Sequence, residues 1–244
     1  MKLSMKMRAF VIATGAALLM AGCASASSRN VVLGSDTMTS HTIPIEDFTA
    51  VVIDGEFDVS FRNSSEATLG VEIQEDMFEH LSVHVQNGAL IIGSNKPIST
   101  SVNNTPRVNI GAPYLEAVVL RGAVNATNWD EIRAQDFFIG IDGASKINIT
   151  MHVEHLDVDV SGAASLELHG SADIAHIYTS GASEVSAGNL QTLVAGVEIS
   201  GAGGVHIAVS ERLYVDISGA GNVLYSGNPV IEQNISGVGS VRQY

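Results

Sequence analysis

Serine stands directly before one of a series of regularly spaced glycines at five places in the second half of the chain, and a serine in a glycine-rich turn is a candidate nucleophile. These serines are Ser161, Ser180, Ser200, Ser218 and Ser236. A serine nucleophile needs one specific base beside it, which five equivalent copies cannot all have, and the sequence contains no G-x-S-x-G elbow. We therefore interpret the serines as corner residues of a repeat and predict no catalytic residue.

Acidic residues and tyrosines recur three and five residues before the glycines of this repeat. The candidate ligand-binding set is Asp159, Tyr178, Glu198, Tyr214 and Asp216. On one face of a sheet such residues would be neighbours at about 5 Å. Tyrosine rings offer stacking area and carboxylates accept hydrogen bonds from sugar hydroxyls, while Glu198 and Asp216 side by side could share a calcium ion. The alternative interpretation is a solvated polar face without a ligand, as is normal for an exposed sheet.

Neither a metal centre nor a hydrolytic site is favoured by the remaining candidates. The histidines at 152, 155, 169 and 176 stand at different distances from their nearest repeat glycine, so they do not converge as zinc or iron ligands would. Paired carboxylates on neighbouring coils could support glycoside cleavage, but the repeats carry no long insertion that would wall a cleft. A polysaccharide-active enzyme is therefore the least favoured class.

The elements that position these side chains are set by a repeat of about nineteen residues. One glycine marks each repeat, at intervals of 18 to 21 residues: Gly122, Gly143, Gly162, Gly181, Gly201, Gly219 and Gly237. Aliphatic residues fill most positions two and four before and four and six after these glycines, with polar residues between them. Such alternation predicts two half-buried strands joined by a corner, where glycine's access to positive φ lets successive corners stack.

The repeat predicts an all-β fold, a parallel β-helix-like solenoid with coils of about 18–21 residues. The period is too short for a repeat that contains a helix. We expect residues 113–244 to form the coils and residues 41–112 to form a strand-rich N-terminal part. Within that part, residues 75–81 predict a short helical turn and Asn87-Gly88 predicts a tight hairpin turn.

The first 22 residues have the pattern of an export signal. A basic start is followed by the apolar run AFVIATGAALLM at 9–20, which is too short to cross a bilayer. The run leads into LMAGC, which resembles the lipobox of bacterial lipoproteins, so we predict that Cys23, the single cysteine, is acylated and anchors the chain in a bilayer. Ala24 resembles the outer-membrane sorting pattern, and residues 23–40 are expected to form a flexible tether.

The net charge of −14 opposes binding to nucleic acid or to an anionic lipid surface, because both would repel the chain. We therefore predict no nucleic-acid partner. No cofactor is predicted apart from the calcium ion considered above.

The chain resembles the bacterial envelope family described as putative auto-transporter adhesin, head GIN domain. The resemblance covers about residues 45–243 and rests on VVIDGEFDVSF, NGALIIG and the corner sequences DGASKINI, SGAASLEL, SGASEVSA, SGAGGVHI and SGAGNVLY. It implies a right-handed parallel β-helix in an exported or lipid-anchored protein and supplies no catalytic residues.

Two non-enzymatic functions remain open. The first is adhesion or recognition of a glycan or protein ligand at the cell envelope. The second is an envelope scaffold or maintenance protein that contacts other proteins, or a second copy of itself, through coil ends or sheet edges.

Overall fold

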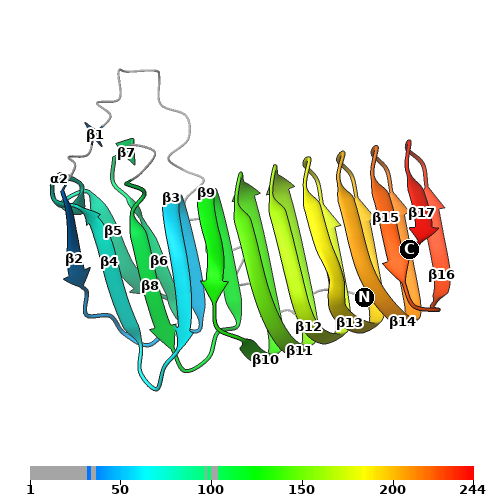
Figure 1. Cartoon of the computed structure of the whole chain (residues 1–244), viewed down its shortest axis with the longest axis horizontal. Helices are drawn as coiled ribbons and strands as arrows, with labels where there is room; N and C mark the ends of the chain where they lie inside the picture. The colour runs from blue at the N-terminus through cyan, green and yellow to red at the C-terminus, as the bar shows by residue number, and fades with distance from the viewer. Residues whose placement is uncertain (1–31, 34–36, 97, 100–103) are drawn as a thin grey trace.

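A computed structural model describes residues 32–33, 37–96, 98–99 and 104–244, and it is nearly all β (Figure 1). The described part contains one short helix, α2 (Glu75–Phe78), at the position where the sequence predicted a helical turn. Within the described residues, no helix combines the length and the apolar character that a membrane span requires.

The strands of the N-terminal part are short, apart from β3. They are β1 (Val32–Leu33), β2 (Met38–Thr42), β3 (Ala50–Asn63), β4 (Thr68–Gln74), β5 (Leu81–Gln86), β6 (Ala89–Ser94), β7 (Ile98–Ser99) and β8 (Arg107–Ala112). The strands that follow are longer, and most bend around a corner: β9 (Ala117–Trp129), β10 (Ile132–Gly143), β11 (Lys146–Gly162), β12 (Ser165–Thr179), β13 (Glu184–Ile199) and β14 (Gly204–Ile217). β15 (Asn222–Ser226) completes the coil before the last, and the last coil consists of β16 (Val230–Ile235) and β17 (Ser240–Gln243).

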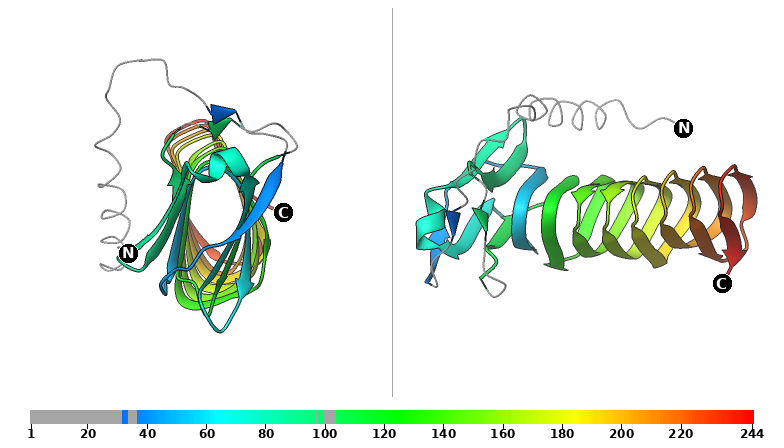
Figure 2. Two further views of the ribbon diagram at one scale, coloured as in Figure 1. Left: turned by 90° about the vertical axis from the view of Figure 1, so that its left-hand side faces the viewer. Right: turned by 90° about the horizontal axis from the view of Figure 1, so that it is seen from above.

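The chain winds into a parallel β-solenoid of about seven turns, which confirms the predicted fold class. Each coil pairs in parallel with the next, from β9 with β10 through β14 with β16 and β15 with β17. Figure 2 shows the stacked coils end on, as an oblong ring with a wall on each side. We call the wall formed by the residues just before each corner glycine the pre-corner face, and the wall formed by the residues just after it the post-corner face.

The repeat glycines form the corners as predicted, for two physical reasons. The first is backbone conformation: Gly143 has φ 140°, a value in a region that residues other than glycine rarely adopt. Gly181 is not in that region, but a Cβ there would overlap the carbonyl oxygen of Gly162 in the preceding coil. Close stacking is secured by hydrogen bonds from coil to coil, such as that from the Ala182 N–H to the Gly162 carbonyl at 2.8 Å.

The stack begins one coil earlier than the period of nineteen indicates. β3 pairs in parallel with β9, and this pairing places Gly55 opposite Gly122. The chain between these two coils forms the N-terminal end of the solenoid (Figure 1). There β8 pairs with β3, β4 with β8 and β2 with β4, while β5 and β6 form the predicted hairpin, with Asn87 at φ 53° and Gly88 at φ 77°.

The predicted tether differs from the structure at its C-terminal end. β2 begins at Met38, inside the range 23–40, and β1 pairs with β7. β2 pairs with the edge of β4 through backbone hydrogen bonds. Its side chains are half-buried or exposed and lack a strong apolar pattern, so the sequence gives little sign of this strand. The predicted export signal, Cys23 and most of the tether lie outside the described residues.

The core runs along the inside of the solenoid and consists of the inward members of each alternating strand. Ile53, Leu120, Ile147, Leu166 and Val197 are at most 1% exposed and belong to one continuous cluster. A second buried cluster lies on the other side of the same early strands: Ala50, Val52, Ala89, Ala117, Val119 and Phe138. The segments of β3, β6, β9 and β10 that carry these residues are thus apolar both on the side facing the core and on the outer side.

Candidate functional site

The predicted ligand-binding residues lie on the outside of the pre-corner face. Strand register places Asp159 beside Tyr178, Tyr178 beside Glu198 and Glu198 beside Asp216, on four successive coils. Tyr214 points to the same side two residues before Asp216. We call these five residues the acid–tyrosine ladder. At the usual spacing of parallel strands, its four rungs extend over about 14 Å.

The two tyrosines of the ladder present their side chains to solvent while their hydroxyls contact neighbours. Tyr178 is 39% exposed, and its hydroxyl lies 3.3 Å from the Ser200 Oγ of the next coil. Tyr214 is 38% exposed, and its hydroxyl accepts a hydrogen bond of 3.0 Å from Arg212. This hydrogen bond, supported by the negative charges of Glu232 and Glu211, raises the pKa of Arg212. The rings are therefore held in place with accessible faces.

A histidine outside the predicted set adds to this surface. Gly196 lies between His176 and Tyr214 in the register of β12, β13 and β14. A Cβ at Gly196 would come within 2.9 Å of the His176 Nδ1, so the imidazole covers the position where Gly196 has no side chain. The signal for this arrangement was a glycine within an otherwise polar outward column.

The carboxylates of the ladder differ in their surroundings. Glu198 and Asp216 are exposed and face each other in register, an arrangement of like charges that is unfavourable. Asp216 accepts a hydrogen bond of 3.2 Å from the Asn234 amide, which partly compensates for that repulsion. Asp159 is also exposed, but partial desolvation of its carboxyl raises its pKa above the ordinary value.

The described part of the chain contains no preformed cluster of ligands for calcium or another metal. Among these residues, no group of three or more His, Cys, Asp or Glu side chains is placed to hold a metal ion. The histidines considered in the sequence are dispersed: His152 lies 2.8 Å from the Ser171 Oγ, and His155 forms a contact of 3.0 Å with Asp136. Within the ladder, Glu198 and Asp216 are the two carboxylates that are direct neighbours in register.

The serines before the corner glycines make contacts that fit a structural role. The Ser161 hydroxyl lies within hydrogen-bonding distance of the Ile141 carbonyl and of the Asp142 carboxylate in the preceding coil. Ser180 makes a similar long contact with the Val160 carbonyl. These contacts tie each corner to the coil before it.

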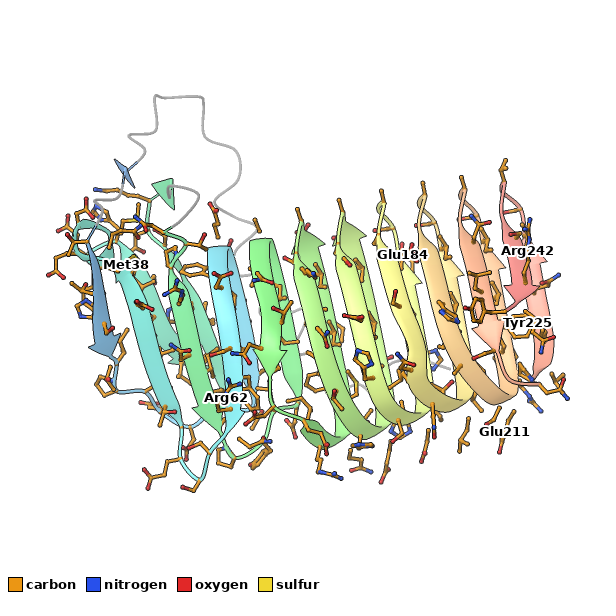
Figure 3. The ribbon with its side chains drawn as sticks, in the orientation of Figure 1. Met38, Arg62, Glu184, Glu211, Tyr225 and Arg242 are labelled. Atoms are coloured by element: carbon orange, nitrogen blue, oxygen red, sulfur yellow. The ribbon has the colours of Figure 1, made fainter. Side chains whose placement is uncertain are left out.

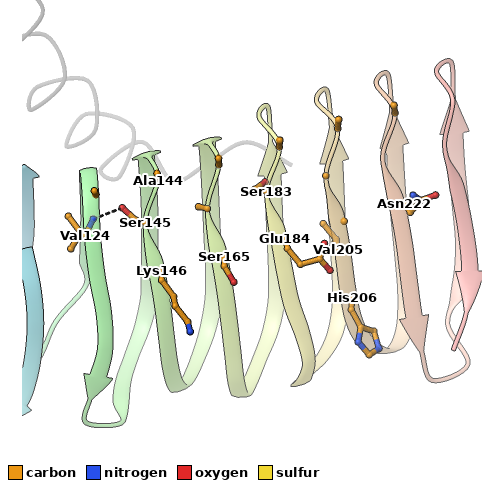
Figure 4. A pocket seen from close by; sticks show the side chains of 18 of the residues that line it. Val124, Ala144, Ser145, Lys146, Ser165, Ser183, Glu184, Val205, His206 and Asn222 are labelled. Atoms are coloured by element: carbon orange, nitrogen blue, oxygen red, sulfur yellow. Dashed lines mark hydrogen bonds between the residues drawn. The ribbon is translucent and has the colours of Figure 1, made fainter. Parts of the chain in front are cut away.

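Sequence reasoning missed a groove that follows the corners on their other side (Figure 4). It has a volume of about 780 Å³ and runs across the coils from β9 to β15. It is lined by the alanine that follows most corner glycines, as at Ala144 and Ala182, and by polar side chains such as Lys146, Glu184 and His206. The available signal was the small residue that recurs after the glycine, which tight stacking of the corners also explains.

Two extended surfaces thus flank one ridge of Ser-Gly-Ala corners on a regular parallel β-solenoid. The protein is therefore of the parallel β-solenoid class. The chain belongs to the family described as putative auto-transporter adhesin, head GIN domain, whose model matches residues 47–229.

Three solved structures illustrate the fold that this chain shares. A "putative adhesin" from Bacteroides fragilis superposes with a TM-score of 0.81 at 19% identity, covering 87% of this chain and 100% of that one. A "putative lipid binding protein" from Parabacteroides distasonis gives a TM-score of 0.66 at 19% identity, with 88% and 100% covered. A "putative adhesin" from Parabacteroides merdae gives 0.60 at 19% identity, with 87% and 98% covered. Among curated proteins, none matches this sequence.

Proposed function

We propose that this protein is an exported, non-enzymatic recognition protein of the bacterial envelope that binds glycans through the acid–tyrosine ladder. The observation that carries the proposal is the register of the ladder, which places the partly exposed Tyr178 between the carboxylates of Asp159 and Glu198 on successive coils, with Tyr214 on the same face. Membership of an adhesin family supports the non-enzymatic role.

The chemistry of the ladder suits a sugar chain better than a protein partner. Tyr178 and Tyr214 offer ring faces to the apolar side of a pyranose, and Glu198 and Asp216 accept hydrogen bonds from its hydroxyls. Three of the five ladder residues are carboxylates, a residue type that is depleted at protein–protein interfaces. A flat, polar, repetitive surface can bind successive sugars of one chain with modest affinity each.

We further propose that the mature protein is anchored to a membrane, in our proposal the outer membrane, through acylated Cys23. The support is the sequence pattern LMAGC after a basic start and a short apolar run. In this arrangement the lipid holds the solenoid at the envelope, and the ladder contacts ligands in its surroundings.

The test is a glycan-array screen of residues 24–244, with and without calcium. We expect binding that the Tyr178→Ala, Tyr214→Ala double variant loses and that the Tyr114→Ala variant keeps. Tyr114 is the matched control, because it is 56% exposed and lies outside the ladder. Binding that survives the double substitution would assign recognition to another surface, and the absence of any glycan binding would overturn the proposal. Binding only with calcium would assign the ion to the carboxylate pair.

A further inference from the structure

Exposed apolar side chains gather at the C-terminal end of the solenoid. Ile235 is 37% exposed and Val238 85%, and both belong to the last coil. Val230, 64% exposed, points outward on the pre-corner face beside Arg212. Figure 3 shows Tyr225 and Arg242 at the same end. Elsewhere on the coils, large exposed apolar residues stand singly, as Leu193 does on β13.

The core itself is partly open at this end. Ile235 is 37% exposed, whereas its register partner in the preceding coil, Ile217, is fully buried. Ile231 is likewise only partly buried, while its partner Leu213 is 0% exposed. These side chains occupy core positions but lack a further coil to cover them within the described residues.

The backbone of the last coil also presents a free edge on both walls. In the described part of the chain, β16 pairs only with β14 and β17 only with β15. The Ser236 N–H donates to the Ile217 carbonyl, so alternate residues of β16 point their N–H groups toward β14. Ile231, Gln233 and Ile235 therefore direct theirs to the open side, where another strand can pair with them.

Charge does not oppose association at this end. Residues 227–244 contain one acidic and one basic side chain, Glu232 and Arg242, so their side chains have no net charge. The whole chain carries −14. Two copies that meet at their last coils therefore avoid most of the repulsion that would separate them in a side-by-side arrangement.

We propose that the partner of this surface is a second copy of the chain, docked end to end through the last coil. A twofold axis perpendicular to the two walls brings β16 against β16 of the other copy and β17 against its β17, both antiparallel. Each wall then continues from one copy into the other, and Ile231 and Ile235 become covered on both sides. The proposal does not depend on what the ladder binds.

The size of the surface sets the strength of the contact. A strand of six residues is about 20 Å long and the two walls lie about 10 Å apart, so with its side chains the end measures on the order of 400 Å² per copy. Stable interfaces usually bury about 800 Å² per partner. We therefore expect a dimer that dissociates in the micromolar range, strengthened by backbone hydrogen bonds at both walls.

Sedimentation equilibrium of residues 24–244, from about 1 µM to about 500 µM, tests this proposal. We expect the mass to approach that of two chains at the upper end. Gln233→Pro removes an N–H of the free edge without touching the pairing to β14, and should weaken the dimer at least tenfold. Ile235→Lys should do the same, because a charge at this half-open core position can reach solvent in the monomer but would be buried in the dimer.

Leu193→Lys is the matched control, because Leu193 is 44% exposed on the side of the solenoid. It should leave the dimer unchanged. A wild-type protein that stays monomeric over the whole range would overturn the proposal. So would a dimer that Ile235→Lys and Leu193→Lys affect equally, because the contact would then lie elsewhere. Circular dichroism of each variant separates lost pairing from lost folding.

Discussion

The corner glycines provide the sharpest test of how the solenoid is held together. Gly181 is the most informative, because its φ is not in the left-handed region and alanine could adopt its backbone conformation. The Cβ of an alanine there would overlap the Gly162 carbonyl oxygen, a backbone atom that cannot turn aside as a side chain would. Gly181→Ala therefore measures the close approach of two coils, separated from any effect of backbone strain.

The expected loss of stability follows from the displacement of the two stacked corners that an added methyl group requires. Relief of the overlap requires the two corners to separate where the Ala182 N–H donates to the Gly162 carbonyl at 2.8 Å. A weakened hydrogen bond costs about 1 kcal/mol, and forced overpacking costs about 1–3 kcal/mol. We expect Gly181→Ala to lower the free energy of unfolding by about 2–4 kcal/mol, a large share of the about 5–15 kcal/mol typical of a domain.

Urea unfolding of residues 24–244 followed by circular dichroism measures this loss. Gly70→Ala in β4 is the matched control, since a Cβ there would meet its nearest atom, the Asn109 Cβ, at 3.8 Å. It should leave stability unchanged or raise it by up to about 1 kcal/mol, because alanine restricts the unfolded chain. A loss below about 0.5 kcal/mol for Gly181→Ala would refute the reasoning, since this lies within the range of ordinary surface substitutions.

Two further predictions concern a titrating side chain and the membrane anchor. The pKa of Asp159 is raised in the folded protein above its ordinary value of 3.8, so the folded state binds this proton more tightly than the unfolded state does. Ionisation of Asp159 therefore lowers the free energy of unfolding as the pH rises through the folded pKa. Below the unfolded pKa the carboxyl is protonated in both states and does not reduce stability. Asp159→Asn should therefore raise the urea midpoint at pH 7 more than at pH 3, and an equal effect at both values would contradict this origin. Cys23→Ala should abolish incorporation of labelled palmitate and release the protein from the membrane fraction, whereas Ser25→Ala should change neither; label that persists without Cys23 would show that another residue is acylated.

The regular coils could be predicted from the sequence because each repeats the same local pattern. The glycine, the aliphatic residues around it and the polar residues between them fix the corner, the two strands and the register together. Register then follows for every outward residue, so the sequence alone was enough to place Asp159, Tyr178 and Glu198 side by side. Ligand binding by these residues remains a prediction, because a binding surface and a solvated surface have the same strand pattern.

The first coil was missed because its partner lies far away in the sequence. Gly55 and Gly122 are neighbours in the stack, but the strands β4 to β8 and helix α2 are inserted between them. A fixed period cannot reveal a repeat that is interrupted in this way. The sequence VVIDGEFDVSF does carry the corner pattern, with Gly55 between alternating apolar residues, and this likeness was the signal available.

The second buried cluster was missed because a continuous apolar run does not identify which of its residues face outward. Val118 and Leu120 belong to the core, while Val119 between them belongs to the outer cluster with Phe138. Strands buried on both faces have this composition in parallel sheets. The groove was missed for a different reason. The alanine that follows most corner glycines is also explained by tight stacking of the corners, so the sequence alone does not indicate that these alanines line a groove.

The outer pre-corner face changes from apolar to polar between β10 and β11, and this limits where a ligand can be recognised. Phe138 is followed in register by Asp157, and Gly140 by Asp159, so only the coils from β11 onward carry the ladder. The ladder therefore lies in the same half of the molecule as the end that we propose to dimerise. Because the proposed twofold axis is perpendicular to the walls, it places both ladders on one side of the dimer. A polymer that lies across the junction could then contact both ladders, and the second contact would be intramolecular. We therefore expect long glycans to bind more tightly than short ones, and Gln233→Pro to remove this difference while leaving the binding of short glycans unchanged.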